Sequence, residues 1–241
     1  MLYKTKGIVL KTTDYADNSV IAKIYTSKFG LQSYLINGVK KPKAKIRMNM
    51  LQPLHILDLV VYHKPQGNIQ RISDAKSDPV LQSIPYHIIK SAMVMFLNEM
   101  IYKSLKQQHE DEIMFTFIEK SIELLDKSES NFVNFHLIFL IKLTRFLGFY
   151  PELELEKNYP FFDLKDGVFV PHQPPHIYFI EEEYIHAWRN LCLQSIDNFY
   201  DLKIDAKTRK YLLSKIIDFY KLHIEDFGTI KSNLILEEVL S

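Results

Sequence analysis

Cysteine, glycine and long apolar runs are scarce in this sequence, and each scarcity excludes a class of protein. The 241 residues include one cysteine, Cys192, which excludes an intramolecular disulfide and a zinc site made of cysteines alone. The seven glycines are scattered and form no phosphate-binding loop. No uncharged apolar run approaches the roughly 20 residues of a membrane span, and residues 1–6 lack a secretory core. We therefore expect a cytoplasmic protein with no membrane partner.

Glutamate is missing from the first third of the chain, although the whole chain carries a net charge of only +1. Residues 1–80 hold 13 lysines and arginines against five aspartates, a net charge of +8. The other 161 residues hold 17 basic and 24 acidic side chains, a net charge of −7. Such asymmetry indicates a segment that faces nucleic acid, although a solvated basic face that binds nothing would have the same composition.

The first 80 residues have the patterns of β-strands. Between 19 and 26 the side chains alternate, with Val20, Ala22 and Ile24 on one face and Ile21, Lys23 and Tyr25 on the other. Five strands are predicted, at residues 7–13, 19–26, 31–37, 51–63 and 69–75. This number and spacing fit a small closed barrel, and a simple meander sheet would give the same pattern.

From residue 80 onward the apolar spacing becomes helical. Helices are predicted at about 83–107, 111–125, 131–147, 181–199, 205–225 and 234–240. The helix at 131–147 is apolar on most faces, so we expect it at the centre of the core. Residues 152–180 are irregular and proline-rich, with a small hairpin at 161–170. The predicted fold class is therefore α+β with two domains, a β domain at 1–79 and a helical domain at 80–241 that carries this insert.

Several short motifs, in order, give the chain a resemblance to the bacterial RecO family, the recombination mediators of DNA repair. The N-terminal motifs are Gly7-Ile8-Val9-Leu10, Asp14-Tyr15, Ile24-Tyr25-Thr26 and Gly38-Val39-Lys40-Lys41-Pro42-Lys43. In the C-terminal half they are Leu147-Gly148-Phe149-Tyr150-Pro151 and Ile230-Lys231-Ser232. The resemblance implies an N-terminal five-stranded OB-fold barrel followed by an all-helical domain.

The resemblance also implies a function and partners. We expect a protein that binds single- and double-stranded DNA, anneals complementary strands, and assists recombinase loading onto DNA coated by single-stranded DNA-binding protein. The implied partners are RecR and the C-terminal tail of single-stranded DNA-binding protein, with Lys210, Lys215 or Lys221 as candidates to pair with a tail carboxylate. Many members carry a four-cysteine zinc motif where this chain has residues 152–170 without cysteine, so the chain looks like the zinc-free branch. There, Phe161-Phe162-Asp163 and the turn at Gly167 would hold the loop by packing.

The residues themselves supply a candidate DNA interface. Five cations fall within eight residues after the third strand, namely Lys40, Lys41, Lys43, Lys45 and Arg47. Flexible cations on a loop contact phosphates without reading bases. Lys11 and Lys23 on the strands would extend this track. Tyr25 and Tyr34, with Phe29 nearby, are candidates for base stacking, although a barrel tyrosine is at least as often part of the core.

Enzymatic alternatives have little support in the sequence. His172 and His176 are separated by Pro174 and Pro175, which excludes the helical two-histidine metal geometry. Cys192 lies between Leu191 and Leu193 in an amphipathic stretch, which favours a buried, unreactive thiol. We therefore expect no enzyme, cofactor or metal. Two alternatives stay open, an OB-fold RNA-binding or ribosome-associated factor and a scaffold whose basic half docks an acidic protein.

Overall fold

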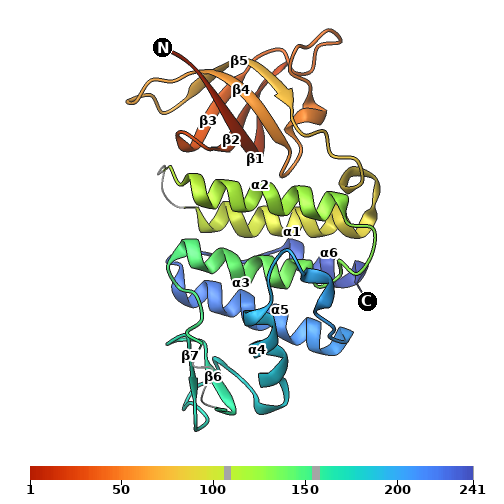
Figure 1. Cartoon of the computed structure of the whole chain (residues 1–241). Helices are drawn as coiled ribbons and strands as arrows, with labels where there is room; N and C mark the ends of the chain where they lie inside the picture. The colour runs from red at the N-terminus through yellow and green to blue at the C-terminus, as the bar shows by residue number, and fades with distance from the viewer. Residues whose placement is uncertain (106–109, 154–157, 241) are drawn as a thin grey trace. The chain divides into compact units, whose positions relative to one another are not determined.

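The computed structural model describes residues 1–105, 110–153 and 158–240 (Figure 1). They divide into two compact units, Met1–Lys127 and Ser128–Ser241. Among the described residues, no helix combines the length and apolarity needed to cross a membrane. The first compact unit includes the strands and the two helices that follow them, and it ends at Lys127. The domain boundary predicted between residues 79 and 80 stays a prediction.

Five strands at the N-terminus form a closed barrel. They are β1 (Leu2–Ala16), β2 (Ser19–Thr26), β3 (Gly30–Ile36), β4 (Ile56–Tyr62) and β5 (Gln70–Ser77). Their order around the barrel is β1-β2-β3-β5-β4, and β4 closes on β1. Only the β3–β5 pair is parallel among these strands. The predicted fold class, an OB-type barrel followed by helices, is confirmed, and the meander sheet is excluded because the sheet closes.

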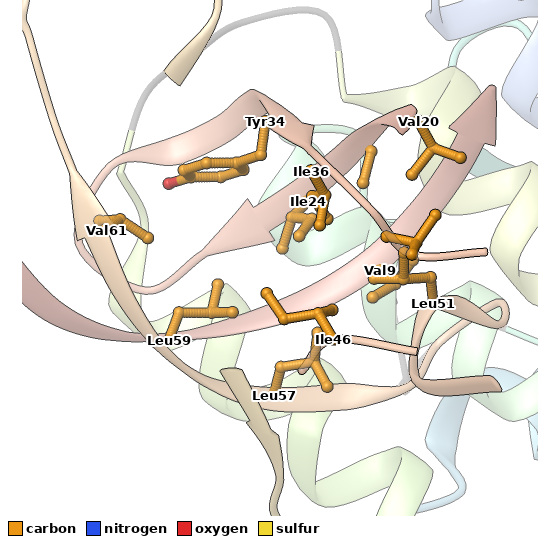
Figure 2. Packing of buried hydrophobic residues seen from close by; sticks show 12 residues of the cluster. Val9, Val20, Ile24, Tyr34, Ile36, Ile46, Leu51, Leu57, Leu59 and Val61 are labelled. Atoms are coloured by element: carbon orange, nitrogen blue, oxygen red, sulfur yellow. The ribbon is translucent and has the colours of Figure 1, made fainter. Parts of the chain in front are cut away.

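Alternating side chains of the strands fill the barrel. Val20, Ala22 and Ile24 of β2 all point inward, as the period of two requires. Figure 2 shows Val20 and Ile24 together with inward side chains from β1, β3 and β4. Gly7 permits the close packing of β1, because a Cβ atom there would lie 2.6 Å from Ile24 Cγ2 and from Leu59 Cδ1.

Two strands, β1 and β4, differ most from the sequence pattern. β1 is longer than predicted because its first half pairs with β4 and its second half with β2. β4 begins at Ile56 rather than Leu51, because Met48–Leu51 forms a short 3₁₀ helix, η1. After it, Pro53 has no N–H for a ladder and Leu54 has a positive φ of 57°. Leu51 and Leu54 are nevertheless buried, which explains the apolar run in the sequence.

Two helices pack on the barrel within the first unit. A short 3₁₀ turn, η2 (Ile84–Tyr86), precedes α1 (Ile88–Ser104), and α2 (Glu112–Lys127) follows. The predicted end of the first helix at about 107 lies outside the described residues. Asn98 of α1 donates a hydrogen bond to the Leu10 carbonyl at 2.8 Å, and Lys6 pairs with Glu119 of α2 at 2.6 Å. These contacts connect both helices to β1.

The second unit is mainly helical. It contains α3 (Phe135–Leu147), η3 (Glu182–Tyr184), α4 (Ile185–Leu193), η4 (Phe199–Asp201), α5 (Ala206–His223) and α6 (Ser232–Val239). α3 is buried on most faces, as predicted, and Gly148 ends it with a φ of 86°. Asp205 caps α5 by accepting a hydrogen bond from Thr208 N at 2.7 Å.

The predicted helix at 181–199 is wrong beyond residue 193. α4 ends at Leu193, and residues 194–198 make local bonds instead. Gln194 donates from its side chain to the Asn198 carbonyl, and Asp197 N donates to Ser195 Oγ at 3.3 Å. Such side-chain bonds to nearby backbone compete with helical hydrogen bonds.

The insert forms a three-stranded sheet of β6 (Phe161–Asp163), β7 (Val168–Val170) and β8 (Phe179–Ile180). Phe162 is fully buried, and its ring centroid lies 4.9 Å from that of Phe169 and 5.1 Å from that of Trp188. His176 Nε2 lies 3.2 Å from Asp163 Oδ2. Aromatic packing and this histidine–carboxylate contact therefore hold the segment.

Candidate nucleic-acid interface

The basic loop, defined here as residues 37–47, is anchored at two points in the barrel core. Val39 and Ile46 are buried in the same cluster as the inward strand residues. Figure 2 shows Ile46 among the inward-pointing side chains, near Leu57. The cations between and beside these anchors are all exposed, namely Lys40, Lys41, Lys43, Lys45 and Arg47. The structure thus brings these five predicted residues onto one fixed loop with their charged groups in solvent.

Two lysines of the basic loop make ion pairs to different parts of the barrel. Lys40 Nζ lies 2.9 Å from Asp14 Oδ1 on β1, and Lys45 Nζ lies 3.1 Å from Asp74 Oδ1 on β5. Exposed pairs of this kind contribute about 0–1 kcal/mol and weaken in salt. A phosphate can therefore replace either aspartate at little cost.

Lys11 and Lys23 lie directly opposite each other on β1 and β2. Like charges facing each other across an antiparallel pair are destabilising. The Lys11 ammonium lies 5.4 Å from the centre of the Tyr102 ring of α1, a cation–π contact that offsets part of the repulsion. An anion between the two lysines would offset more of it.

The structure removes Tyr25 and Tyr34 from the set of stacking candidates. The Tyr34 ring lies inside the barrel with no exposed surface (Figure 2). Tyr25 points outward from β2 but is covered by α2. Its ring centroid lies 5.8 Å from that of Phe115, and its hydroxyl donates a hydrogen bond to the Asp111 carbonyl at 3.1 Å. Burial raises the pKa of both phenols. Neither ring has a free face for a base.

Phe29, the third aromatic candidate, is half-buried. Its ring stacks on His63 with centroids 4.0 Å apart, and the Tyr3 ring meets it edge-on at 5.4 Å. One face of Phe29 is therefore already occupied by protein. None of the three predicted stacking rings therefore has both faces free, and the candidate interface rests on its cations.

A separate cavity of about 260 Å³ lies within the helical unit. Its apolar lining includes Leu213 of α5 and Leu240, next to the buried His136 of α3. Burial, together with the nearby Arg209 charge, lowers the pKa of His136 to about 3, so the imidazole is neutral at pH 7. The charged side chains that line the cavity come from α5 and α6, namely Lys207, Arg209, Lys210 and Glu237.

The sequence pointed to one of these cavity residues, Lys210, and missed Arg209. Lys210 Nζ pairs with Glu237 at 3.3 Å, and Arg209 donates to the Leu240 carbonyl at 3.1 Å. Arg209 appeared in the sequence as one charge on an amphipathic helix, and its proximity to the end of α6 depends on packing. Lys215 lies outside the cavity lining, against the rings of Phe179 and Tyr211. Lys221 is exposed on α5 and also lies outside that lining.

The fold and the basic loop together define a class of protein. Its members have an OB-type barrel with a cationic loop, followed by a helical unit. Residues 1–78 match the family described as "Recombination protein O N terminal", and residues 85–232 match "Recombination protein O C terminal". The chain belongs to the recombination protein O (RecO) family, which confirms the resemblance seen in the sequence.

Similar proteins cover the whole chain. The DNA repair protein RecO of Azobacteroides pseudotrichonymphae is 38% identical over 239 residues, which is 99% of each chain. The DNA repair protein RecO of Phocaeicola vulgatus is 35% identical over 241 residues, covering 100% of both chains. That of Christiangramia forsetii is 35% identical over 240 residues, or 99% of each.

Proposed function

We propose that this protein is a DNA-binding recombination mediator in DNA repair, acting on the nucleoid in the cytoplasm without enzymatic activity of its own. It binds single- and double-stranded DNA through the basic loop and anneals complementary strands. The observation that carries the proposal is the basic loop itself, five exposed cations anchored in an OB-type barrel by Val39 and Ile46. Membership of the RecO family supports the choice of DNA repair.

Annealing follows physically from charge neutralisation. Two complementary strands repel each other through their phosphates, and lysines that neutralise phosphates lower this repulsion. A loop that contacts only the backbone leaves the base edges free to pair. The burial of Tyr25 and Tyr34 is consistent with this, since bases stacked on protein rings would be unavailable for pairing.

The cavity of the helical unit is the proposed docking site for a partner's acidic tail. A tail that ends in apolar residues after carboxylates would place its apolar end near Leu213 and its carboxylates near Lys207, Arg209 and Lys210. Glu237 would have to release Lys210. We assign this tail to single-stranded DNA-binding protein, whose capture would bring the mediator to coated DNA and assist recombinase loading. RecR completes the proposed set of partners.

The first prediction concerns annealing. Reversing four lysines of the basic loop to glutamate should abolish the acceleration of annealing between complementary oligonucleotides, both naked and coated with single-stranded DNA-binding protein. The variant carries Lys40→Glu, Lys41→Glu, Lys43→Glu and Lys45→Glu. The matched control has the same change in net charge on exposed lysines outside the barrel and should anneal like the wild type. It carries Lys120→Glu, Lys127→Glu, Lys203→Glu and Lys221→Glu.

Annealing by the loop variant at the wild-type rate would refute the proposal. Competition with an RNA oligonucleotide of matched sequence separates DNA repair from the RNA-binding alternative. The proposal expects no large preference for RNA, because loop lysines contact the phosphates that both polymers share.

A further inference from the structure

A groove of about 500 Å³ lies on the barrel, and no residue of the basic loop lines it. β1, the β2–β3 turn, β4 and β5 form its walls. Four lysines line it, namely Lys4, Lys6, Lys28 and Lys76, together with Asp58 and Asp74. In the sequence these lysines are separated by up to 72 positions, so no local run of charge marks them.

Strand register places these charges in two rows across three strands. In one row, Lys6 of β1 is opposite Asp58 of β4, which is opposite Lys76 of β5. In the next row, Lys4 is opposite Val60, which is opposite Asp74. Side chains of facing residues lie on the same face of a sheet, and neighbouring strands are about 4.8 Å apart. The groove floor is therefore a charged face that is fixed by backbone pairing.

Ion pairs leave this face with an excess of positive charge. Lys6 is paired with Glu119 of α2 at 2.6 Å, and Asp74 is paired with Lys45 at 3.1 Å. The remaining lining lysines, Lys4, Lys28 and Lys76, have exposed side chains. Three exposed cations then face one further carboxylate, Asp58.

The Lys45–Asp74 pair also connects the groove to the basic loop. Lys45 belongs to the loop, whereas Asp74 lines the groove. Lys4 lies two strands away from Asp74 in the same row, a separation of roughly 10 Å. The basic loop and the groove therefore adjoin at the Lys45–Asp74 pair.

We infer that this groove binds the phosphate backbone of the same nucleic acid strand that the basic loop holds, and so lengthens its binding site. The inference rests on the proposed function and adds Lys4, Lys28 and Lys76 as phosphate contacts. Asp58 opposes binding there, and Asp74 keeps Lys45 at the junction when no strand is bound.

The test compares oligothymidylates of increasing length by fluorescence anisotropy. Lengths from about 4 to about 30 nucleotides bracket the site sizes of about 4–16 nucleotides known for OB barrels. The groove variant carries Lys4→Glu, Lys28→Glu and Lys76→Glu. Loss of three phosphate contacts should make the slope of log K against log salt shallower by about 2 for long strands. Short strands, held by the loop alone, should bind almost as tightly as to the wild type.

A matched control reverses three exposed cations outside the groove, with Lys64→Glu, Arg71→Glu and Lys120→Glu. A second variant, Asp58→Asn, guards against misfolding because it should gain affinity for long strands and not for short ones. If the groove variant and the control bind long strands with equal affinity and salt slope, or if Asp58→Asn has no effect, the groove is not part of the path.

Failure of this inference differs from failure of the proposed function. A groove variant that binds normally, beside a basic-loop variant that does not bind, overturns only the groove and leaves it as a surface for an acidic protein. A basic-loop variant that binds DNA like the wild type overturns the proposed function.

Discussion

At the scale of single residues, Tyr34 shows how the barrel sets the role of a side chain. It shares the inward face of β3 with Gln32 and Ile36, so its ring packs in the core. Its hydroxyl is buried and has no hydrogen-bond partner within the described part of the chain. A buried polar atom without a partner costs free energy on folding. The Tyr34 hydroxyl therefore adds no stability compared with the hydrogen atom that phenylalanine carries at the same ring position.

We predict that Tyr34→Phe leaves the unfolding free energy unchanged or raises it by up to about 1 kcal/mol. Binding of single-stranded DNA should also be unchanged, since the ring does not reach solvent. Tyr15→Phe is the control, because Tyr15 is exposed. Chemical denaturation and anisotropy give both quantities. A marked loss of DNA affinity in Tyr34→Phe would mean that the ring does leave the core to meet bases.

These tyrosines also mark the limit of prediction from sequence. The alternation in β2 correctly predicts which side chains share a face. It does not say that α2 covers the outer face of β2, because the contact between Tyr25 and Phe115 joins residues 90 positions apart. The cations of the basic loop were predictable because they are close in sequence. The lysines of the groove were not, since only strand register brings them together.

At the scale of elements, Asp126 fixes the start of η2 against the end of α2. Its carboxylate accepts hydrogen bonds from the backbone N–H groups of Gln82, Ser83 and Ile84 at 2.8–2.9 Å. Partial burial alone would raise the pKa of Asp126, but these donors and the Ser83 hydroxyl outweigh it and lower the pKa below its ordinary value. The lowered pKa means that the ionised carboxylate stabilises the folded state.

This contribution should depend on pH in a definite direction. It is fully present above the ordinary pKa of about 4 and is lost as the pH falls through the lower, folded-state pKa. Asp126→Ala should therefore cost about 1–3 kcal/mol at pH 7, because it leaves backbone donors unpaired, and less in acid. Protection of the backbone amides of residues 82–84 from hydrogen exchange measures this loss of stability. Asp197→Ala is the control, because Asp197 is exposed. Equal protection in Asp126→Ala and the wild type at pH 7 would contradict this view of the turn.

At the scale of the whole molecule, the proposed function assigns DNA binding to the first compact unit and tail binding to the second. The basic loop is in the first compact unit, and the cavity lined by Lys207, Arg209 and Lys210 is in the second. Sites without shared residues respond independently to substitution in most proteins. DNA binding and tail binding should therefore be separable by mutation.

We predict that Lys207→Glu combined with Lys210→Glu weakens binding of a fluorescent peptide with the sequence of the acidic tail at least about tenfold, equal to about 1.4 kcal/mol. Single-stranded DNA binding should be retained. The four-lysine loop variant should show the opposite pattern, and Lys221→Glu on the same helix is the control. Because His136 stays neutral, peptide affinity should not depend on that histidine between pH 5 and pH 8. Simultaneous loss of both activities in either variant would show that the two sites are not separate.

The most direct measurement of the central idea, that anchored cations hold DNA by its phosphates, is a salt titration of single-strand affinity. On a strand short enough to be held by the basic loop alone, four or five neutralised phosphates predict a slope of log K against log salt of roughly −3 for the wild type. The four-lysine loop variant should bind much more weakly, with a slope near zero. A wild-type slope near zero, or a variant with the same affinity and slope as the wild type, would contradict the account.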